Sequence, residues 1–163
     1  MSTGRRTRMR GFSLLELVIV VVIIGIIAAI AIPRMSRGTA GATDSALTGD
    51  LAVLRNAIEL FAAEHDGKYP TIGKIANQLT LYTDSTNTSD PVAAKDASHQ
   101  FGPYVRAIPK LPVGTYKGKD TFTATTPPGT AEAGWVYDEV TGKVQANTKD
   151  NEIDAAETKY SDY

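Results

Sequence analysis

Residues 11–33 read GFSLLELVIVVVIIGIIAAIAIP, and this stretch decides the fold of the chain. Between Leu17 and Ile32 it carries no polar side chain. As an α-helix, residues 12–32 would be about 31 Å long, which matches the roughly 30 Å hydrocarbon core of a bilayer. The sequence therefore predicts a transmembrane helix over residues 12–33.

The composition of the whole 163-residue chain is ordinary, with 42% apolar residues and no cysteine. This composition excludes a disordered chain and a disulfide scaffold. The residues beyond 33 are enough for one hydrophobic core but not for two. We therefore expect one folded domain after the apolar stretch.

The leader of residues 1–11 contains four arginines and no acidic residue. By the positive-inside rule this leader stays in the cytoplasm and the folded domain lies across the membrane. Removing the four arginines from the 17 basic residues leaves 13 against 18 acidic ones, a net charge of −5, so we expect no nucleic-acid binding. A secretory signal peptide cut after Ala31 is an alternative, but the carboxylate of Glu16 is costly in such an apolar segment.

The heptapeptide GFSLLEL of residues 11–17 combines a glycine, an aromatic residue and a lone glutamate at the start of the apolar run. It resembles the processing motif of type IV prepilins and type II secretion pseudopilins. In that family a prepilin peptidase cuts after the glycine and methylates the new amino terminus. The resemblance implies cleavage between Gly11 and Phe12, with N-methylated Phe12 as the first mature residue.

Glu16 is the one charged residue within the apolar segment. Once the chain is cut, Phe12 carries a positive amine, and a carboxylate in an apolar bundle needs such a partner or must be neutralised. We hypothesise that Glu16 of one subunit pairs with the Phe12 amine of a neighbour and sets the register of assembly. The alternative is a carboxylate that only reaches the interface near the helix end.

Gly25 and Pro33 interrupt the helical pattern of this segment. Glycine lowers helix propensity and proline removes an amide donor, so the stretch between them is predicted to be flexible. In the pilin family the corresponding stretch unwinds in the filament. A simple kink at Pro33 is equally compatible with the sequence.

The exported part begins with a segment of residues 34–66. Its first ten positions, residues 34–43, are rich in glycine and hydroxyl residues and predict a weak helix or a flexible joint. Apolar residues then recur at helical spacing over residues 44–65, as Leu47, Leu51, Leu54, Ile58 and Phe61. This stripe predicts an amphipathic helix that buries one face and stops at Gly67.

Residues 67–147 contain short strand candidates and one short helix candidate, residues 72–81. Alternation over residues 120–126 predicts one strand, and residues 135–137 and 143–146 predict a hairpin with Gly142 in its turn. Trp135 is expected in the core. The predicted fold class is α+β: a long amino-terminal helix, transmembrane in its first half and amphipathic in its second, packed on a small antiparallel sheet.

The resemblance extends to residues 67–71, 102–109 and 134–147, which look like the major pseudopilin of type II secretion, although residues 109–114 and the tail depart from it. Major pseudopilins bind calcium near their carboxyl terminus. Asp150, Glu152 and Asp154, in an acidic tail of residues 148–163, are therefore considered as calcium ligands, although their spacing does not make an EF-hand. A solvated tail, with a short helix capped by Asn151, is the simpler interpretation. The two histidines, His65 and His99, are interpreted as surface polar residues.

These features predict a structural protein and not an enzyme, because no hydrolase, phosphate-loop or dinucleotide motif is found. The resemblance implies a subunit of a type II secretion pseudopilus that polymerises into a helical homo-oligomer after cleavage. Its expected partners are the prepilin peptidase, the assembly platform, minor pseudopilins and the inner membrane, with the exported domain in the periplasm. A type IV pilus subunit for adhesion, motility or DNA uptake is the alternative, and an unprocessed membrane-anchored binding protein is the third.

Overall fold

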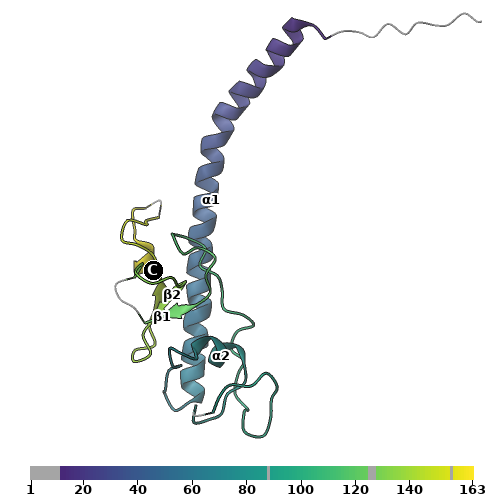
Figure 1. The fold of residues 1–163 in the computed structure, drawn as a ribbon. Coiled ribbons are helices and arrows are strands. Elements are labelled where there is room, and N and C mark those ends of the chain that lie inside the picture. The colour runs from purple at the N-terminus through teal and green to yellow at the C-terminus, as the bar shows by residue number, and fades with distance from the viewer. Residues whose placement is uncertain (1–11, 88, 125–127, 155) are drawn as a thin grey trace, which may run out of the picture. The chain divides into compact units, whose positions relative to one another are not determined.

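The computed structural model describes residues 12–163, except residues 88, 125–127 and 155, and gives the backbone but not the side chains of residues 30–40. The chain divides into two compact units, Met1–Thr39 and Ala40–Tyr163, which are described separately. The elements, in chain order, are α1 (Leu14–Glu64), α2 (Ile75–Thr80), β1 (Phe122–Thr123), β2 (Trp135–Tyr137), β3 (Val144–Ala146) and the 3-10 helix η1 (Tyr160–Asp162) (Figure 1).

The described part of the first unit is the apolar beginning of α1. Its large side chains are exposed from Leu14, at 80%, to Ile27, at 60%. The helical backbone of α1 runs without interruption through Gly25 and Pro33, so residues 34–43 are helical. In the described part of the chain, which omits the side chains of residues 30–40, no helix is both long enough and apolar enough to cross a membrane.

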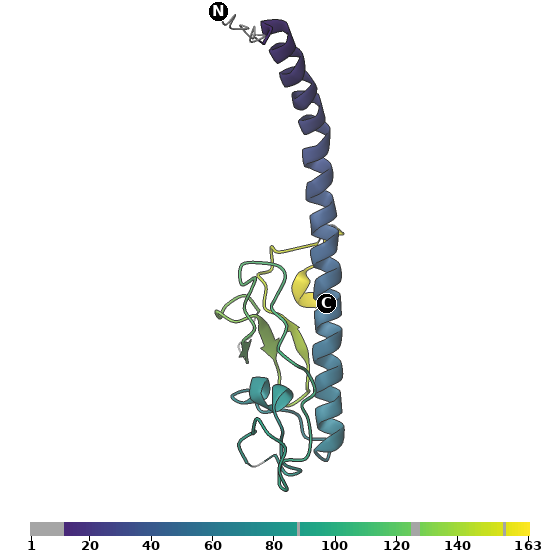
Figure 2. The same cartoon turned by 90° about the vertical axis from the view of Figure 1, so that its right-hand side faces the viewer.

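The second unit, Ala40–Tyr163, is called the exported unit after its predicted location, and the second part of α1 supplies its core. The apolar stripe predicted from the sequence is confirmed, because its members are at most 1% exposed: Leu47, Leu51, Leu54, Ile58 and Phe61. They pack against α2 and against Trp135 and Tyr137 of β2, which are also buried. Figure 2 shows α2 and the three strands on one side of this part of α1.

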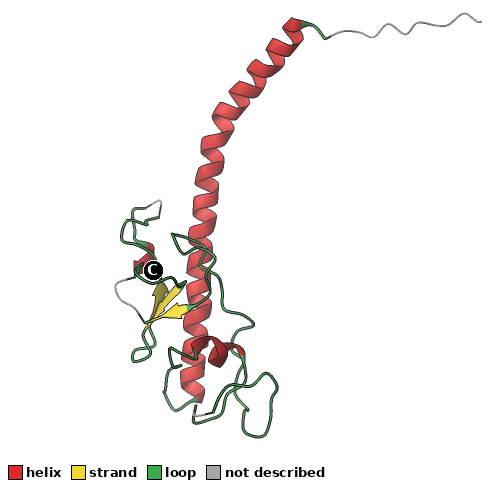
Figure 3. Ribbon diagram, in the orientation of Figure 1, coloured by secondary structure: helices red, strands yellow, loops and turns green. Residues whose placement is uncertain are grey.

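The three strands form one mixed sheet in the order β1-β2-β3 (Figure 3). The hairpin prediction is confirmed, since Trp135 pairs with Ala146 and Tyr137 with Val144 in antiparallel register. The prediction of an all-antiparallel sheet is wrong for the other pair, because β1 runs parallel to β2. Eleven residues, 124–134, separate β1 from β2 in the sequence, and parallel strands need a longer connection than the two-residue turn that can join antiparallel strands.

The end of α1 makes contacts that the sequence does not predict. Gly67 has a φ of +76° and donates its amide to the Ala62 carbonyl at 2.8 Å, which confirms the predicted stop. The interpretation of His65 as a surface residue is wrong, because its side chain is fully buried and stacks on Phe61 with ring centres 3.9 Å apart. One ring nitrogen of His65 bonds the Phe61 carbonyl at 2.7 Å, and the other bonds the Thr83 hydroxyl at 3.1 Å.

Candidate functional site

The first turn of α1 contains the residues to which the sequence assigns assembly. The amide of Ser13 donates a hydrogen bond to Glu16 Oε2 at 3.0 Å, and the amide of Leu15 donates one to Ser13 Oγ at 3.3 Å. The bond from Glu16 back to the Ser13 amide is the glutamate half of a capping box, and Ser13 Oγ caps the Leu15 amide, so both bonds satisfy amides that have no partner within the helix. Glu16 is therefore the cap partner of Ser13 within its own chain.

Phe12 lies just before this cap and is 78% exposed. Gly11, the other residue of the predicted cleavage site, lies outside the described residues. The predicted scissile bond thus directly precedes the first described residue, and cleavage there would leave a new amine next to the capping box. A positive amine at this end also needs a carboxylate to offset it, since the helix start carries partial positive charge.

Gly25 lies in the middle of the apolar part of α1. A Cβ added to it would meet no atom within 4 Å in the single chain, so intrachain packing does not require glycine there. Pro33 lies within the helical backbone, but its side chain is outside the described set. The flexibility assigned to residues between Gly25 and Pro33 stays a prediction.

The three carboxylates considered for calcium lie in the carboxyl-terminal segment and each has protein partners. Glu152 accepts hydrogen bonds from the Thr115 amide and hydroxyl, both at 2.6 Å, and from the Lys149 amide at 2.8 Å. Asp150 forms an exposed ion pair with Lys159 at 3.1 Å. Within the described residues, no group of three or more His, Cys, Asp or Glu is placed to hold a metal ion.

Asp154 is the third of these carboxylates and it organises the end of the chain. It accepts hydrogen bonds from the amides of Ala156 and Thr158, at 2.7 and 2.8 Å, and from the Tyr163 hydroxyl. The Tyr163 hydrogen bond is the main reason that the pKa of Asp154 is lowered. The pKa of Glu152 is also lowered: burial raises it, but the hydrogen bonds from Thr115 and Lys149 outweigh burial.

The carboxyl-terminal segment is solvated, as expected, in that none of its described residues beyond Thr148 is buried, but its end is also attached to α1. The Tyr160 hydroxyl donates a hydrogen bond to Asp44 of α1 at 2.9 Å, and Arg55 of α1 donates one to the Tyr163 carbonyl. Burial and the Asp44 carboxylate raise the pKa of Tyr160 to about 12. The short helix in this segment is η1 at Tyr160–Asp162, not one capped by Asn151.

Sequence reasoning missed two of these features for different reasons. The capping box carries a visible local signal, a serine followed three positions later by a glutamate. The contact between Tyr160 and Asp44 joins residues that are 116 positions apart, and no spacing rule predicts it.

Comparisons with known proteins agree with the resemblance at the amino terminus. A family profile described as "Prokaryotic N-terminal methylation motif" matches residues 6–32. The chain is 28% identical over 111 residues to Type II secretion system core protein G of Aeromonas hydrophila, covering 68% of this chain and 71% of that protein. It is 29% identical over 108 residues to the protein of that name in Klebsiella pneumoniae, covering 66% and 71%.

A third relative belongs to another group by name. The chain is 43% identical over 68 residues to Fimbrial protein Q of Moraxella bovis, covering 42% of each chain. No solved structure matches this chain.

Proposed function

We propose that this chain, a type IV pilin-like protein with a prepilin methylation motif, is a structural subunit of a type II secretion pseudopilus. The observation that carries the proposal is the methylation motif over residues 6–32, read together with similarity to core protein G over about two thirds of the chain. The family is structural and is not a known class of enzyme.

The apolar beginning of α1 has two uses in this proposal. Before assembly it anchors the exported unit in the inner membrane, with the leader of residues 1–11 in the cytoplasm and the exported unit in the periplasm. After assembly it packs among the same helices of other subunits, because side chains that satisfy lipid also satisfy one another. The large side chains from Leu14 to Ile27 are exposed within the described part of the single chain, which supports this dual use.

Processing precedes assembly in this scheme. A prepilin peptidase cuts between Gly11 and Phe12 and methylates the Phe12 amine. Glu16 then exchanges its bond to the Ser13 amide for an ion pair with the Phe12 amine of a neighbouring subunit. The remaining partners are the assembly platform of the secretion system and its minor pseudopilins.

A type IV pilus subunit is the second candidate. The observation that favours it is the similarity to a fimbrial protein, 43% over 68 residues. The similarity to core protein G extends over 111 residues and is therefore the broader support.

The deciding experiment is the intact mass and amino-terminal sequence of the protein recovered from membranes of its native host. A chain that begins at N-methylated Phe12 supports the proposal. A chain that begins at Met1 makes the protein a fixed anchor, and one that begins after Ala31 makes it a secreted protein; either result rejects the filament role. Deleting the gene and measuring secretion and surface pili separately then distinguishes the two filament types.

A further inference from the structure

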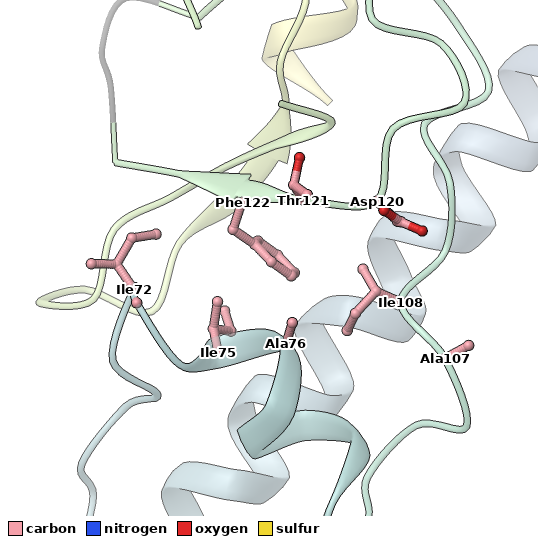
Figure 4. Close-up of a pocket in the computed structure, with 9 residues that line it drawn as sticks. Ile72, Ile75, Ala76, Ala107, Ile108, Asp120, Thr121 and Phe122 are labelled. Carbon is pink, nitrogen blue, oxygen red and sulfur yellow. The ribbon is translucent and has the colours of Figure 1, made fainter. Parts of the chain in front are cut away.

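An open apolar pocket lies on the exported unit between α2, residues 107–108 and the outer edge of the sheet. It measures about 400 Å³, and its apolar lining includes Ile72, Ile75, Ile108 and Phe122. Figure 4 shows the Phe122 ring directed into this space, with Ile75 and Ile108 beside it and Asp120 at its border. Asp120 is exposed and takes part in no ion pair within the described residues.

The wall of the pocket is well fixed. Ile75 is only 1% exposed and belongs to the core cluster, and Phe122 packs against the same cluster. Phe122 also pairs with Trp135, and its ring meets that of Tyr137 edge-on at 6.2 Å. A preformed pocket costs little to fill, because its side chains are already ordered.

A second surface of the exported unit carries a positive charge, opposite to the negative charge at the border of the pocket. Ala93, Ala94 and Lys95 are exposed, and Lys95 has no ion pair in the described part of the chain. The loop that carries them is anchored on both sides. Val92 exchanges two backbone hydrogen bonds with Tyr82, each at 2.9 Å, and Asp96 accepts hydrogen bonds from the amides of residues 98 and 99.

This three-residue projection offers small apolar side chains followed by one positive charge. The pocket offers an apolar floor bordered by one negative charge. Small side chains let the main chain of the projection enter the pocket, and Lys95 would then neutralise Asp120. Residues 93–95 do not line the pocket, so a contact between these two surfaces of neighbouring copies is heterologous. A heterologous contact builds a ring where its rotation closes and a filament where it does not.

We propose that the projection Ala93–Lys95 of one subunit occupies the Ile75–Phe122 pocket of the next, with Lys95 paired to Asp120. This inference rests on the proposed filament function and adds a contact between exported units to the packing of the amino-terminal helices. The occupant is a second copy of the chain, because a filament brings copies together at high local concentration and the charges are complementary.

The absence of cysteine from the chain gives a clean background for crosslinking. The test variant carries Ala94→Cys and Ala107→Cys, one in the projection and one on the pocket lining. Filaments assembled in the native host are treated with a mild oxidant and run on a non-reducing gel. A heterologous contact gives a ladder of trimers and longer products, whereas either single variant gives none. Ala94→Cys with Val140→Cys is the matched control, because Val140 is 82% exposed but does not line the pocket.

Charge exchange provides an independent readout. Lys95→Glu and Asp120→Lys should each lower filament yield about fivefold or more, and the double variant should restore at least half of the yield. Lys68→Glu, at an exposed position away from both surfaces, should leave the yield unchanged. Circular dichroism of each variant checks that the exported unit is folded.

The outcomes distinguish a failure of the proposed contact from a failure of the proposed pseudopilus function. A ladder from the 94/107 pair, together with charge rescue, supports the contact. Filaments that form normally but give no ladder, or single charge variants that assemble like wild type, overturn the contact and leave the pseudopilus function intact. A native host in which the wild-type chain forms no filament overturns both.

Discussion

The Ser13 amide donates a hydrogen bond to Glu16 Oε2 at 3.0 Å at the start of α1, while Ser13 Oγ accepts one from the Leu15 amide at 3.3 Å. Capping and the proposed pairing during assembly therefore depend on the same carboxylate. A substitution that removes Glu16 altogether would affect both roles at once, so separating them needs a change that keeps the cap and removes the charge.

Glu16→Gln makes this separation, because glutamine also serves at the third position of a capping box. If the charge pairs with the Phe12 amine of a neighbour, Glu16→Gln should lower filament yield about tenfold or more, the equivalent of about 1.4 kcal/mol or more. Ser13→Ala should cost about 1 kcal/mol at the helix start and change the yield by less than about threefold. Filament yield by electron microscopy and sedimentation measures both, and Glu16→Gln filaments at wild-type yield would reject the pairing.

Asn147 is a buried polar residue whose side chain joins the loop of residues 129–133 to β3. Its amide nitrogen donates to the Ala131 and Ala133 carbonyls at 2.8 and 2.7 Å, and its oxygen accepts from the Gly129 amide at 2.6 Å. Asn147→Ala removes these three hydrogen bonds and should lower the free energy of unfolding by about 2–4 kcal/mol.

Urea unfolding of the full chain in detergent, followed by the fluorescence of the single tryptophan, measures this loss. Trp135 is fully buried, so its emission reports the core directly. Asn77→Ala is the control, because Asn77 is exposed on α2; it should change stability by less than about 0.5 kcal/mol. Equal stability of the two variants would contradict the role of Asn147.

The two faces of the second part of α1 should respond differently to the same substitution. Leu54 is 0% exposed and Leu60 is 52% exposed. Leu54→Ala should therefore lower the free energy of unfolding by about 2–5 kcal/mol, since it removes buried apolar area and leaves a cavity. Leu60→Ala should change it by less than about 0.5 kcal/mol. The same urea titration decides, and similar losses at both positions would mean that the stripe is not the core face.

Glu152 should make the exported unit sensitive to acid. Its pKa is lowered in the folded chain, so its stabilising contribution is complete above the unfolded value of about 4.3 and is lost as the pH falls through the lower folded value. Urea unfolding at pH 5.5 and at pH 3 should show a smaller loss for Glu152→Gln than for wild type. Asp66→Asn, at an exposed carboxyl in the turn after α1, should lose as much as wild type. Equal losses in all three proteins would remove Glu152 as a source of the pH dependence.

Calcium held by Asp150, Glu152 and Asp154 would have to replace the hydrogen-bond donors that now surround two of these carboxylates. Such binding predicts a higher melting temperature in calcium than in chelator, with about 2.7 kcal/mol of added stability at a concentration 100 times the dissociation constant. Asp150→Asn should reduce that difference. Identical melting curves of the wild-type chain in calcium and in chelator would end the calcium hypothesis.

The parts of this fold that sequence predicts are those encoded by local period. The spacing of three and four from Leu47 to Phe61 states which face of the helix is buried, because successive turns place those residues on one side. Short-range patterns also predict that Trp135 is buried and that a hairpin forms around Gly142. The methylation motif is likewise contiguous, so a processing site between Gly11 and Phe12 can be predicted without any structure.

The parts that sequence does not predict depend on contacts between distant segments. β1 pairs parallel with β2, and alternation within a strand cannot show the direction in which it pairs. The burial of His65 depends on Thr83 and on Phe101, whose ring lies 5.5 Å from the imidazole. An isolated histidine at a helix end looks the same in sequence whether solvent or another loop covers it.

Hydrogen bonds attach the rest of the exported unit to the second part of α1 near its beginning and at its end. Near the beginning the Tyr160 hydroxyl bonds Asp44, and at the end the Tyr104 hydroxyl bonds Glu64 at 2.6 Å. In mechanical terms, these two hydrogen bonds attach both ends of this part of the helix to the rest of the unit. In the filament proposed above, the hydrogen bonds at Asp44 and Glu64 oppose lengthening of the helix between them, so a load would extend the part of α1 before Asp44 more readily.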